Sequence, residues 1–318
     1  MYAGREMYEE ISDLAVARAI FSKSIERVEL ETHSYCNRRC SYCPNVVGDR
    51  IGPNQFMPAD IWEKILNGLG DIDYRNCLVL NYYNEPLADL SILDRIREAR
   101  ARVPNCRIMI YSNGDYLEPA LIDQLADAGL DYLHISIHLK RGDQYSDLYV
   151  VNRINEISVR MGISAQIHTL RSQDFAIAKA PHRKMEIEVR GINFYRHGTD
   201  RGGLIDDIHT QAKRKDPCFF PFAHFVIGYN GQLAPCCHIR SDRPEHEGYT
   251  YGNLRDYETI YHAFLSGPGA AWRRELVGTQ EKRSPCDTCV AGKIADPAAL
   301  AKLAELRQRF LGEEAPAA

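Results

Sequence analysis

Apolar residues recur along this chain with two periods, one typical of buried strands and one typical of helices that bury a single face. Between residues 25 and 195, short apolar segments alternate with longer segments whose apolar residues repeat every three to four positions. The predicted strands are Ile25–Glu31, Cys77–Tyr82, Arg107–Tyr111, Tyr132–Ile137, Ala165–Leu170 and Met185–Tyr195. One predicted helix opens at Met57-Pro58-Ala59-Asp60, and the others span Leu90–Val103, Leu117–Ala128 and Asp147–Met161.

This alternation predicts an α/β fold with a parallel sheet, because a helix crosses over between successive parallel strands. The six predicted strands fall short of the eight of a complete TIM barrel. Residues 1–24 carry a helical pattern, and residues 198–215, rich in Gly, Asp, Arg and Lys, form a predicted linker. Sites in parallel sheets form at the carboxyl ends of strands, so polar residues there are candidates for function.

The composition excludes several classes of partner. Of the 318 residues, 26% are charged and 45% are hydrophobic, and the net charge of −4 gives no sign of a surface for nucleic acid. No apolar run approaches the roughly 20 residues that cross a bilayer, and the acidic start lacks the apolar core of a signal peptide. We therefore expect a cytoplasmic protein with no membrane or nucleic-acid partner and with reduced cysteines.

Cys36, Cys40 and Cys43 lie on one short loop behind the first predicted strand. Thiolates are the preferred ligands of iron–sulfur clusters, and three of them leave the fourth iron of a cubane open to a small molecule. A zinc site would need a fourth ligand nearby, and neither His33 nor Cys77 has the spacing of a zinc finger. The loop therefore predicts a [4Fe–4S] cluster with an open iron.

With Tyr42 before its last cysteine, this loop closely resembles that of the radical S-adenosylmethionine (SAM) superfamily. The resemblance implies that the open iron binds SAM, that the cluster cleaves SAM to a 5′-deoxyadenosyl radical, and that Tyr42 packs near the adenine. It also implies a partial (β/α)6 TIM-type barrel over residues 25–197. An external electron donor such as flavodoxin or ferredoxin would reduce the cluster.

The segment Asn81–Leu87, at the end of the second strand, resembles the "GGEP" motif of that family, whose acidic side chain and backbone bind the SAM ammonium group. The resemblance assigns this role to Glu85 and Asn84. Tyr83 and Asn84 replace the two glycines of the motif, which puts the local backbone path in doubt.

Two further strand ends resemble SAM-binding motifs of the family. Ser112 and Asn113 match a "TNG" end near the SAM ribose and methionyl group, although an Asn-Gly turn explains them equally well. Ser136 and His138 match an "S-[IL]-D" end in which histidine replaces aspartate, so His138 is either a proton-transfer group or a polar strand terminus. On the fifth and sixth predicted strands, polar residues alternate, among them Gln166 and His168, and one parity is expected to line the barrel.

A second set of cysteines follows the linker. Cys218 and Cys236 bracket a predicted β-hairpin over residues 222–234, with its turn at Asn230-Gly231, and the pair Cys286 and Cys289 comes later. Four thiolates suit a second cubane or a zinc ion. The spacing resembles the opening of the SPASM motif, and the lack of its further cysteines resembles the "twitch" variant. That resemblance implies a small α/β domain over residues 216–292 with one auxiliary [4Fe–4S] cluster, which accepts an electron or braces the domain.

Cys237 adjoins one of these ligands, and its side chain can point the other way, toward the barrel mouth. Related epimerases carry a cysteine that returns hydrogen to a substrate radical, and the alternative for Cys237 is simple packing. Cys77 and Cys106, isolated at strand entries, are assigned to packing. A C-terminal helix and tail are predicted over residues 293–318.

The resemblance implies an oxidoreductase or epimerase that abstracts a C–H hydrogen from a small sugar, aminocyclitol or nucleoside of specialised biosynthesis, such as antibiotic biosynthesis. An alternative is a peptide epimerase that uses Cys237, although 24 leading residues are too few for the winged-helix domain of many peptide-modifying relatives. An iron–sulfur electron carrier or regulator is an alternative of another class, but a carrier needs no open iron.

Overall fold

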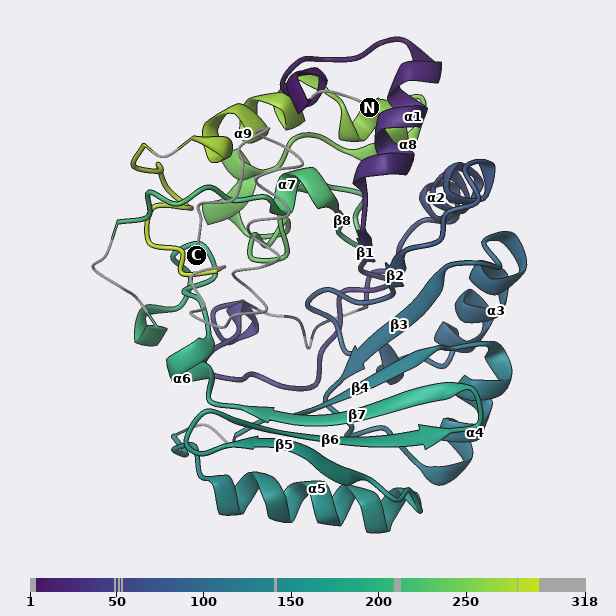
Figure 1. The fold of residues 1–318 in the computed structure, drawn as a ribbon, viewed down its shortest axis with the longest axis vertical. Coiled ribbons are helices and arrows are strands. Elements are labelled where there is room, and N and C mark those ends of the chain that lie inside the picture. The colour runs from purple at the N-terminus through teal and green to yellow at the C-terminus, as the bar shows by residue number, and fades with distance from the viewer. Residues whose placement is uncertain are drawn as a thin grey trace, which may run out of the picture.

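One sheet runs through the molecule (Figure 1) in the order β5-β6-β7-β4-β3-β2-β1-β8-β9. This computed structural model describes residues 4–48, 50, 52, 54–139, 142–208, 213–278 and 280–291. The predicted C-terminal helix lies outside them. The strands of the sheet are β1 Arg27–Leu30, β2 Cys77–Val79, β3 Arg107–Ser112, β4 Tyr132–Ile137, β5 Gln166–Arg171, β6 Phe175–His182, β7 Met185–Ile192, β8 His224–Ile227 and β9 Leu233–Ala234.

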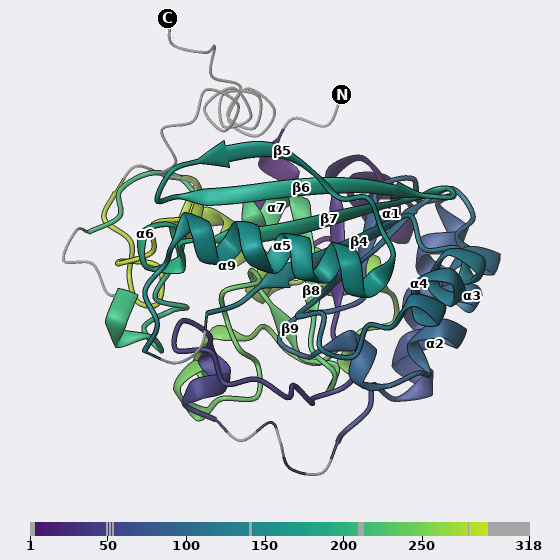
Figure 2. The same cartoon turned by 90° about the horizontal axis from the view of Figure 1, so that it is seen from below.

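The four helices predicted between residues 57 and 161 are present, and the last of them carries a cap at each end. The side chain of Ser146 accepts the N–H of Tyr149 at the start of α5, and Gly162 ends that helix with a φ of 64°. In Figure 2, α5 lies along β6 and β7. The predicted strand Met185–Tyr195 is shorter than expected, because a helical turn begins at Phe194. The helices are α1 Leu14–Ser24, α2 Ala59–Asp71, α3 Ile92–Arg102, α4 Pro119–Ala128, α5 Asp147–Met161, α6 Phe194–His197, α7 Phe220–Ala223, α8 Ile260–Phe264 and α9 Gly267–Val277.

The predicted fold class is confirmed, but its parallel strands differ from the prediction in two places. The parallel run is β8, β1, β2, β3, β4 and β7, so β8, from the segment expected to form the twitch domain, joins the barrel sheet beside β1. The predicted fifth strand is β5, which lies at the sheet edge, antiparallel to β6.

The strand β6 was not predicted from the sequence. Its buried side chains are Ala176, Ala178 and Ala180, and alanine is a weak strand signal. The turn into β7 places Arg183 at a φ of 56° without the glycine or asparagine that usually marks a hairpin. The predicted hairpin of β8 and β9 is confirmed. There, Gly231 has a φ of 81°, and a Cβ atom would lie 2.2 Å from Ile61 Cδ1.

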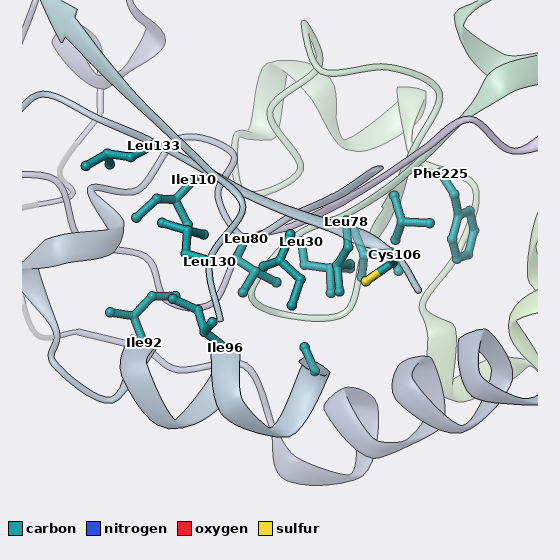
Figure 3. Packing of buried hydrophobic residues seen from close by; sticks show 14 of the residues in the cluster. Leu30, Leu78, Leu80, Ile92, Ile96, Cys106, Ile110, Leu130, Leu133 and Phe225 are labelled. Atoms are coloured by element: carbon teal, nitrogen blue, oxygen red, sulfur yellow. The ribbon is translucent and has the colours of Figure 1, made fainter. Parts of the chain in front are cut away.

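The two faces of the parallel strands differ in chemistry. One residue parity is apolar and packs against the helices: Figure 3 shows Leu30, Leu78 and Leu80 near Ile92 and Ile96 of α3. Each such buried side chain contributes about 1.5–3 kcal/mol to folding. The opposite parity includes a row in register across five strands, formed by Glu29, Val79, Met109, Tyr132 and Glu186. The polar residues of this parity are therefore available to the barrel interior. No helix of the described residues is long and apolar enough to cross a membrane.

Candidate active site

A cavity of about 410 Å³ brings the cysteine loop together with the polar strand ends. It is formed by the loop after β1, the ends of β2, β3, β4 and β7, and segments that follow α6 and β9. The residues predicted from the cluster loop and the strand ends all line it, as does the cysteine beyond β9: Cys36, Cys40, Tyr42, Cys43, Asn84, Glu85, Ser112, Asn113, Ser136, His138 and Cys237.

The loop that carries Cys36, Cys40 and Cys43 is shaped by its own backbone. The N–H of Cys43 donates to the carbonyl of Cys40 at 3.0 Å, and that of Cys36 donates to the carbonyl of Arg50 at 3.3 Å. Burial raises the pKa of Cys36 to about 12 and that of Cys40 to about 11, so both are neutral thiols without a metal. Bound iron would stabilise their thiolates, and three thiols on one cavity fit three irons of a cubane.

A buried ion-pair network anchors this loop. Glu31, at the end of β1, is fully buried and pairs with Arg50, which also pairs with Asp242 at 3.0 Å. Asp242 in turn binds Arg240 at 2.7 Å, and the guanidinium of Arg240 donates to the carbonyl of Pro44 at 2.7 Å. The network therefore ties the cysteine loop to the segment beyond β9.

Glu85 connects two of the predicted strand ends. Its carboxylate accepts the hydroxyl of Ser112 and the backbone N–H of Asn113, each at 2.7 Å, and the N–H of Leu87 at 3.1 Å. Burial raises the pKa of Glu85 to about 7, against the opposing effect of these hydrogen bonds. The carboxyl group is held in one orientation at the cavity wall.

The departure from the glycine-rich motif has a structural explanation. The amide of Asn84 accepts the N–H of Tyr82 at 3.1 Å and donates to Thr32 Oγ1 at 3.2 Å. The backbone of Tyr83 donates to Glu31 and accepts from the side chain of Asn45. Specific hydrogen bonds therefore set the backbone path here in place of glycine.

An aromatic layer covers one side of the cavity. The ring of Tyr42 stacks on Phe194 with centroids 4.3 Å apart and an interplanar angle of 13°. Its hydroxyl lies 3.0 Å from Nδ1 of His138 and accepts the N–H of Leu139 at 3.2 Å. Burial lowers the pKa of His138 to about 3, so the imidazole is neutral. Phe194 was not predicted, because one apolar residue after a strand gives no functional signal.

Another part of the cavity lining, called here the polar wall, was not predicted from the sequence. The unpredicted residues on it are Arg27, Glu29, Tyr111, His134, Arg190 and Arg201. Charged residues at alternate positions of an otherwise apolar strand, such as Arg27 and Glu29, could have predicted this wall. The expectation for Gln166 and His168 was wrong, because β5 is an exposed edge strand and neither side chain lines the cavity.

The second set of cysteines meets at another, much smaller cavity of about 20 Å³. Cys218, Cys236, Cys286 and Cys289 all line it. The backbone N–H of Cys218 donates to the carbonyl of Leu276 at 2.8 Å, and that of Cys289 to the carbonyl of Cys286 at 3.3 Å. Within the described residues, no three His, Cys, Asp or Glu side chains are placed to hold a single metal ion. Four thiols around one small space fit a cubane, whose irons each take one thiolate.

Adjacent cysteines face the two cavities. Cys236 lines the small cavity, and Cys237 lines the large one. The hydroxyls of Tyr82 and Tyr83 donate to the carbonyls of Cys236 and Cys237 at 3.4 and 3.1 Å, which positions this dipeptide. Burial raises the pKa of Cys237 to about 12, so its S–H bond is intact at neutral pH.

Family models account for both cysteine sites. The radical SAM superfamily model matches residues 30–139, and the SPASM model, an iron–sulfur cluster-binding domain, matches residues 218–290. The chain therefore contains a radical SAM domain and a SPASM-type iron–sulfur domain. It is an enzyme that uses SAM and [4Fe–4S] clusters. For the second set of cysteines, this favours an iron–sulfur cluster over the zinc ion that four thiolates could also bind.

Individual relatives agree with this assignment. The S-adenosyl-L-methionine-dependent 2-deoxy-scyllo-inosamine dehydrogenase of Niallia circulans is 22% identical over 214 residues, which cover 67% of this chain and 74% of that protein. The GTP 3′,8-cyclase of Chlorobaculum tepidum is 27% identical over 140 residues, 43% of this chain and 40% of the cyclase. A crystal structure of BtrN with AdoMet and 2-DOIA shares the fold, with a TM-score of 0.59, 19% identity and coverage of 80% of this chain and 88% of BtrN.

Proposed function

We propose that this enzyme abstracts a hydrogen atom from a carbon that bears a hydroxyl or amino group in a small sugar, aminocyclitol or nucleoside, and that this carbon is then oxidised. The observation that carries the proposal is the shared cavity of the cysteine loop, the strand ends and the polar wall. Its volume of about 410 Å³ falls in the range of small-molecule sites. The similarity to an aminocyclitol dehydrogenase supports an aminocyclitol of a biosynthetic pathway as substrate.

In this proposal, Cys36, Cys40 and Cys43 hold the SAM-binding cluster. The cluster and SAM, when bound, supply the 5′-deoxyadenosyl radical. The carboxylate of Glu85, oriented by its hydrogen bonds, faces the SAM ammonium group, and Tyr42 packs near the adenine. The remaining residues assigned to SAM are Asn84, Ser112, Asn113 and Ser136. Flavodoxin or ferredoxin is the proposed electron donor.

The four thiols of the small cavity hold the auxiliary cluster. Among the described residues, the cavity beside them has a volume of about 20 Å³, which is too small for a sugar or an aminocyclitol. Their role in this proposal is therefore to hold an electron acceptor. Cys237 lines the substrate cavity and is next in sequence to Cys236, which lines the small one.

Epimerisation is the second candidate, and the position of Cys237 favours it. Its protonated thiol lines the substrate cavity, and a thiol can return a hydrogen atom to a carbon radical. The product would then be an inverted centre rather than a ketone. A cavity of this volume supports a small molecule over a peptide for either reaction.

Anaerobic reconstitution with iron, sulfide, SAM and dithionite tests the main proposal. With 2-deoxy-scyllo-inosamine and a panel of related aminocyclitols and sugars, we expect 5′-deoxyadenosine together with a ketone from at least one of them. Mass spectrometry of both products is the measurement. Formation of no 5′-deoxyadenosine, with or without these compounds, would overturn the proposal.

A Cys237→Ala variant in deuterated water separates the two reactions. A thiol exchanges with solvent, so an epimerase would place deuterium at the inverted carbon and lose that product in the variant. Dehydrogenation predicts that the variant forms ketone at the wild-type rate with no deuterium in the substrate. Cys106→Ala, in the apolar core, is the matched control for loss of a buried thiol.

A further inference from the structure

A carboxylate lies in the substrate cavity on the first strand of the barrel. Glu29 is 6% exposed, and its inward parity places it on the cavity wall. Its Oε1 atom lies 3.5 Å from Nη1 of Arg27 and 3.9 Å from Nδ1 of His224, which starts the neighbouring strand β8. Burial raises the pKa of Glu29, and the positive charges of Arg27 and Arg201 oppose this effect. The thiol of Cys237 also interacts electrostatically with Glu29.

His224 connects this carboxylate with a different cavity. Its Nδ1 atom is buried and has no hydrogen-bond partner among the described residues. The ring lines a cavity of about 510 Å³ with the exposed Lys23 and the half-buried Glu26 and Cys77, and Arg27 lines both cavities. Arg27, Cys77 and His224 are the first residues of β1, β2 and β8, so this second cavity lies at the amino ends of the parallel strands. It is at the opposite end of the barrel from the cysteine loop.

Oxidation of a carbinol carbon needs an exit for a proton. The C–H hydrogen leaves as an atom to the deoxyadenosyl radical, which leaves an unpaired electron on the carbon. Formation of the C=O bond then releases the O–H proton to a base and one electron, which an auxiliary [4Fe–4S] cluster held by the four thiols would accept. The chain must therefore supply a proton acceptor that lines the substrate cavity.

The other carboxylate and the two imidazoles that line this cavity have partners. Glu85 accepts three hydrogen bonds at the end of β2, and His138 binds the hydroxyl of Tyr42. His134 faces Glu188, with Nδ1 3.4 Å from a carboxylate oxygen. Among the described residues, Glu29 has only the long contacts to Arg27 and His224, so a carboxylate oxygen remains available to a substrate hydroxyl.

We propose that Glu29 accepts the hydroxyl proton of the substrate and that His224 passes it to the cavity at the amino ends of the strands. This inference rests on the dehydrogenation proposed above. Burial lowers the pKa of His224 to about 3, so the imidazole does not keep the proton. It takes a proton at Nδ1 as it releases another from Nε2. The distance of 3.9 Å between Oε1 of Glu29 and Nδ1 of His224 is longer than a hydrogen bond. Catalytic hydrogen bonds are often this long without substrate and shorten when substrate binds.

The first experiment uses the reconstituted enzyme, Glu29→Gln and a substrate deuterated at the target carbon. Glu186→Gln is the matched control, because Glu186 lies in the same row of the sheet but outside the cavity. We expect deuterium in 5′-deoxyadenosine from all three proteins, and ketone formation at least about 100-fold slower in Glu29→Gln alone. Added formate should partly restore ketone formation in Glu29→Ala.

Two outcomes of this experiment are decisive against the inference. Ketone formation by Glu29→Gln at the wild-type rate would overturn the role of Glu29 and leave the proposed dehydrogenation intact. Absence of deuterium transfer in the wild type would overturn the proposed function and this inference with it.

A second experiment tests His224. His224→Ala should slow ketone formation, and imidazole should restore it through the second cavity. His182→Ala, at a histidine that binds Asp123 outside both cavities, should do neither. Equal rates for His224→Ala and wild type would overturn the relay. In the unloaded protein, infrared spectroscopy should show a carboxylic acid band that titrates above the usual glutamate range and is lost in Glu29→Gln; its absence would count against the assignment.

Discussion

The two cysteine sites of this enzyme differ most in the space beside their thiols. Three cysteines line a cavity of about 410 Å³ together with polar strand ends, whereas four cysteines enclose about 20 Å³. The site with three cysteines, rather than four, also has the larger cavity. A site that binds a small molecule at an open iron requires both features. Four thiols without free space fit a centre that only exchanges electrons.

The two cysteine sites are connected through the backbone and through buried ion pairs. They share the Cys236-Cys237 dipeptide, one residue for each cavity, and the buried network through Arg50 joins the segments that carry them. A single sheet supports both sites, because β8 extends the barrel beside β1. Adjacent residues of one segment therefore line the two cavities.

The largest expected difference comes from loss of one thiol at each site. Cys36→Ala should abolish SAM cleavage, because its cluster loses one of three ligands. Cys286→Ala should lose about half of the bound iron and most product, yet still form 5′-deoxyadenosine. Iron and sulfide analysis with chromatography of 5′-deoxyadenosine measures both. Equal loss of SAM cleavage in the two variants would contradict the division of roles.

Removal of the link between the sites should lower stability strongly. Arg50→Met leaves the fully buried Glu31 without its charge partner, so we expect the free energy of unfolding to fall by about 3–5 kcal/mol. The matched control is Arg243→Met, which breaks a pair with the exposed Glu245 and should cost less than about 1 kcal/mol. Urea unfolding of the unloaded protein measures both. Similar losses in the two variants would show that the buried network does not stabilise the fold.

The smallest expected effect is a pH dependence at the open site. The pKa of Glu85 is about 7 in the folded protein, above the ordinary 4.5, so folding favours its protonated form. Its contribution, about 3 kcal/mol, is fully present below about pH 4.5 and is lost as the pH rises through 7. Urea unfolding across this range should therefore show a fall in stability that Glu85→Gln lacks and Glu186→Gln retains. The same slope in the Glu85 variant would refute this assignment.

Much of the site was predictable because its chemistry is local in sequence. Cys36, Cys40 and Cys43 share one loop, and any fold of that loop keeps their thiols within reach of one cluster. The hairpin between Cys218 and Cys236 was equally predictable from its Asn-Gly turn. These patterns depend on spacing and residue type alone.

The polar wall was not predictable in the same way. Arg27, Glu29 and Arg190 lie on strands, and the sequence cannot say which parity faces inward, because a shift of one residue exchanges the two faces. The assignment of Gln166 and His168 failed for a related reason. The strand β6, whose alanines give little signal, inserts between β5 and the parallel strands and moves β5 to the edge.

By itself, then, the sequence predicted two sets of cysteine ligands, the alternation of strands and helices up to β5, and the radical SAM and SPASM-type domains. Only the tertiary structure decided that Cys237 shares a cavity with the cysteine loop while Cys236 does not, and that Glu29 stands between that cavity and His224. The physical reason is the distance along the sequence over which each feature is set. Ligand spacing and hydrophobic period are properties of neighbouring residues, whereas a cavity wall is made by strand pairing and side-chain burial between segments as distant as β1 and β8.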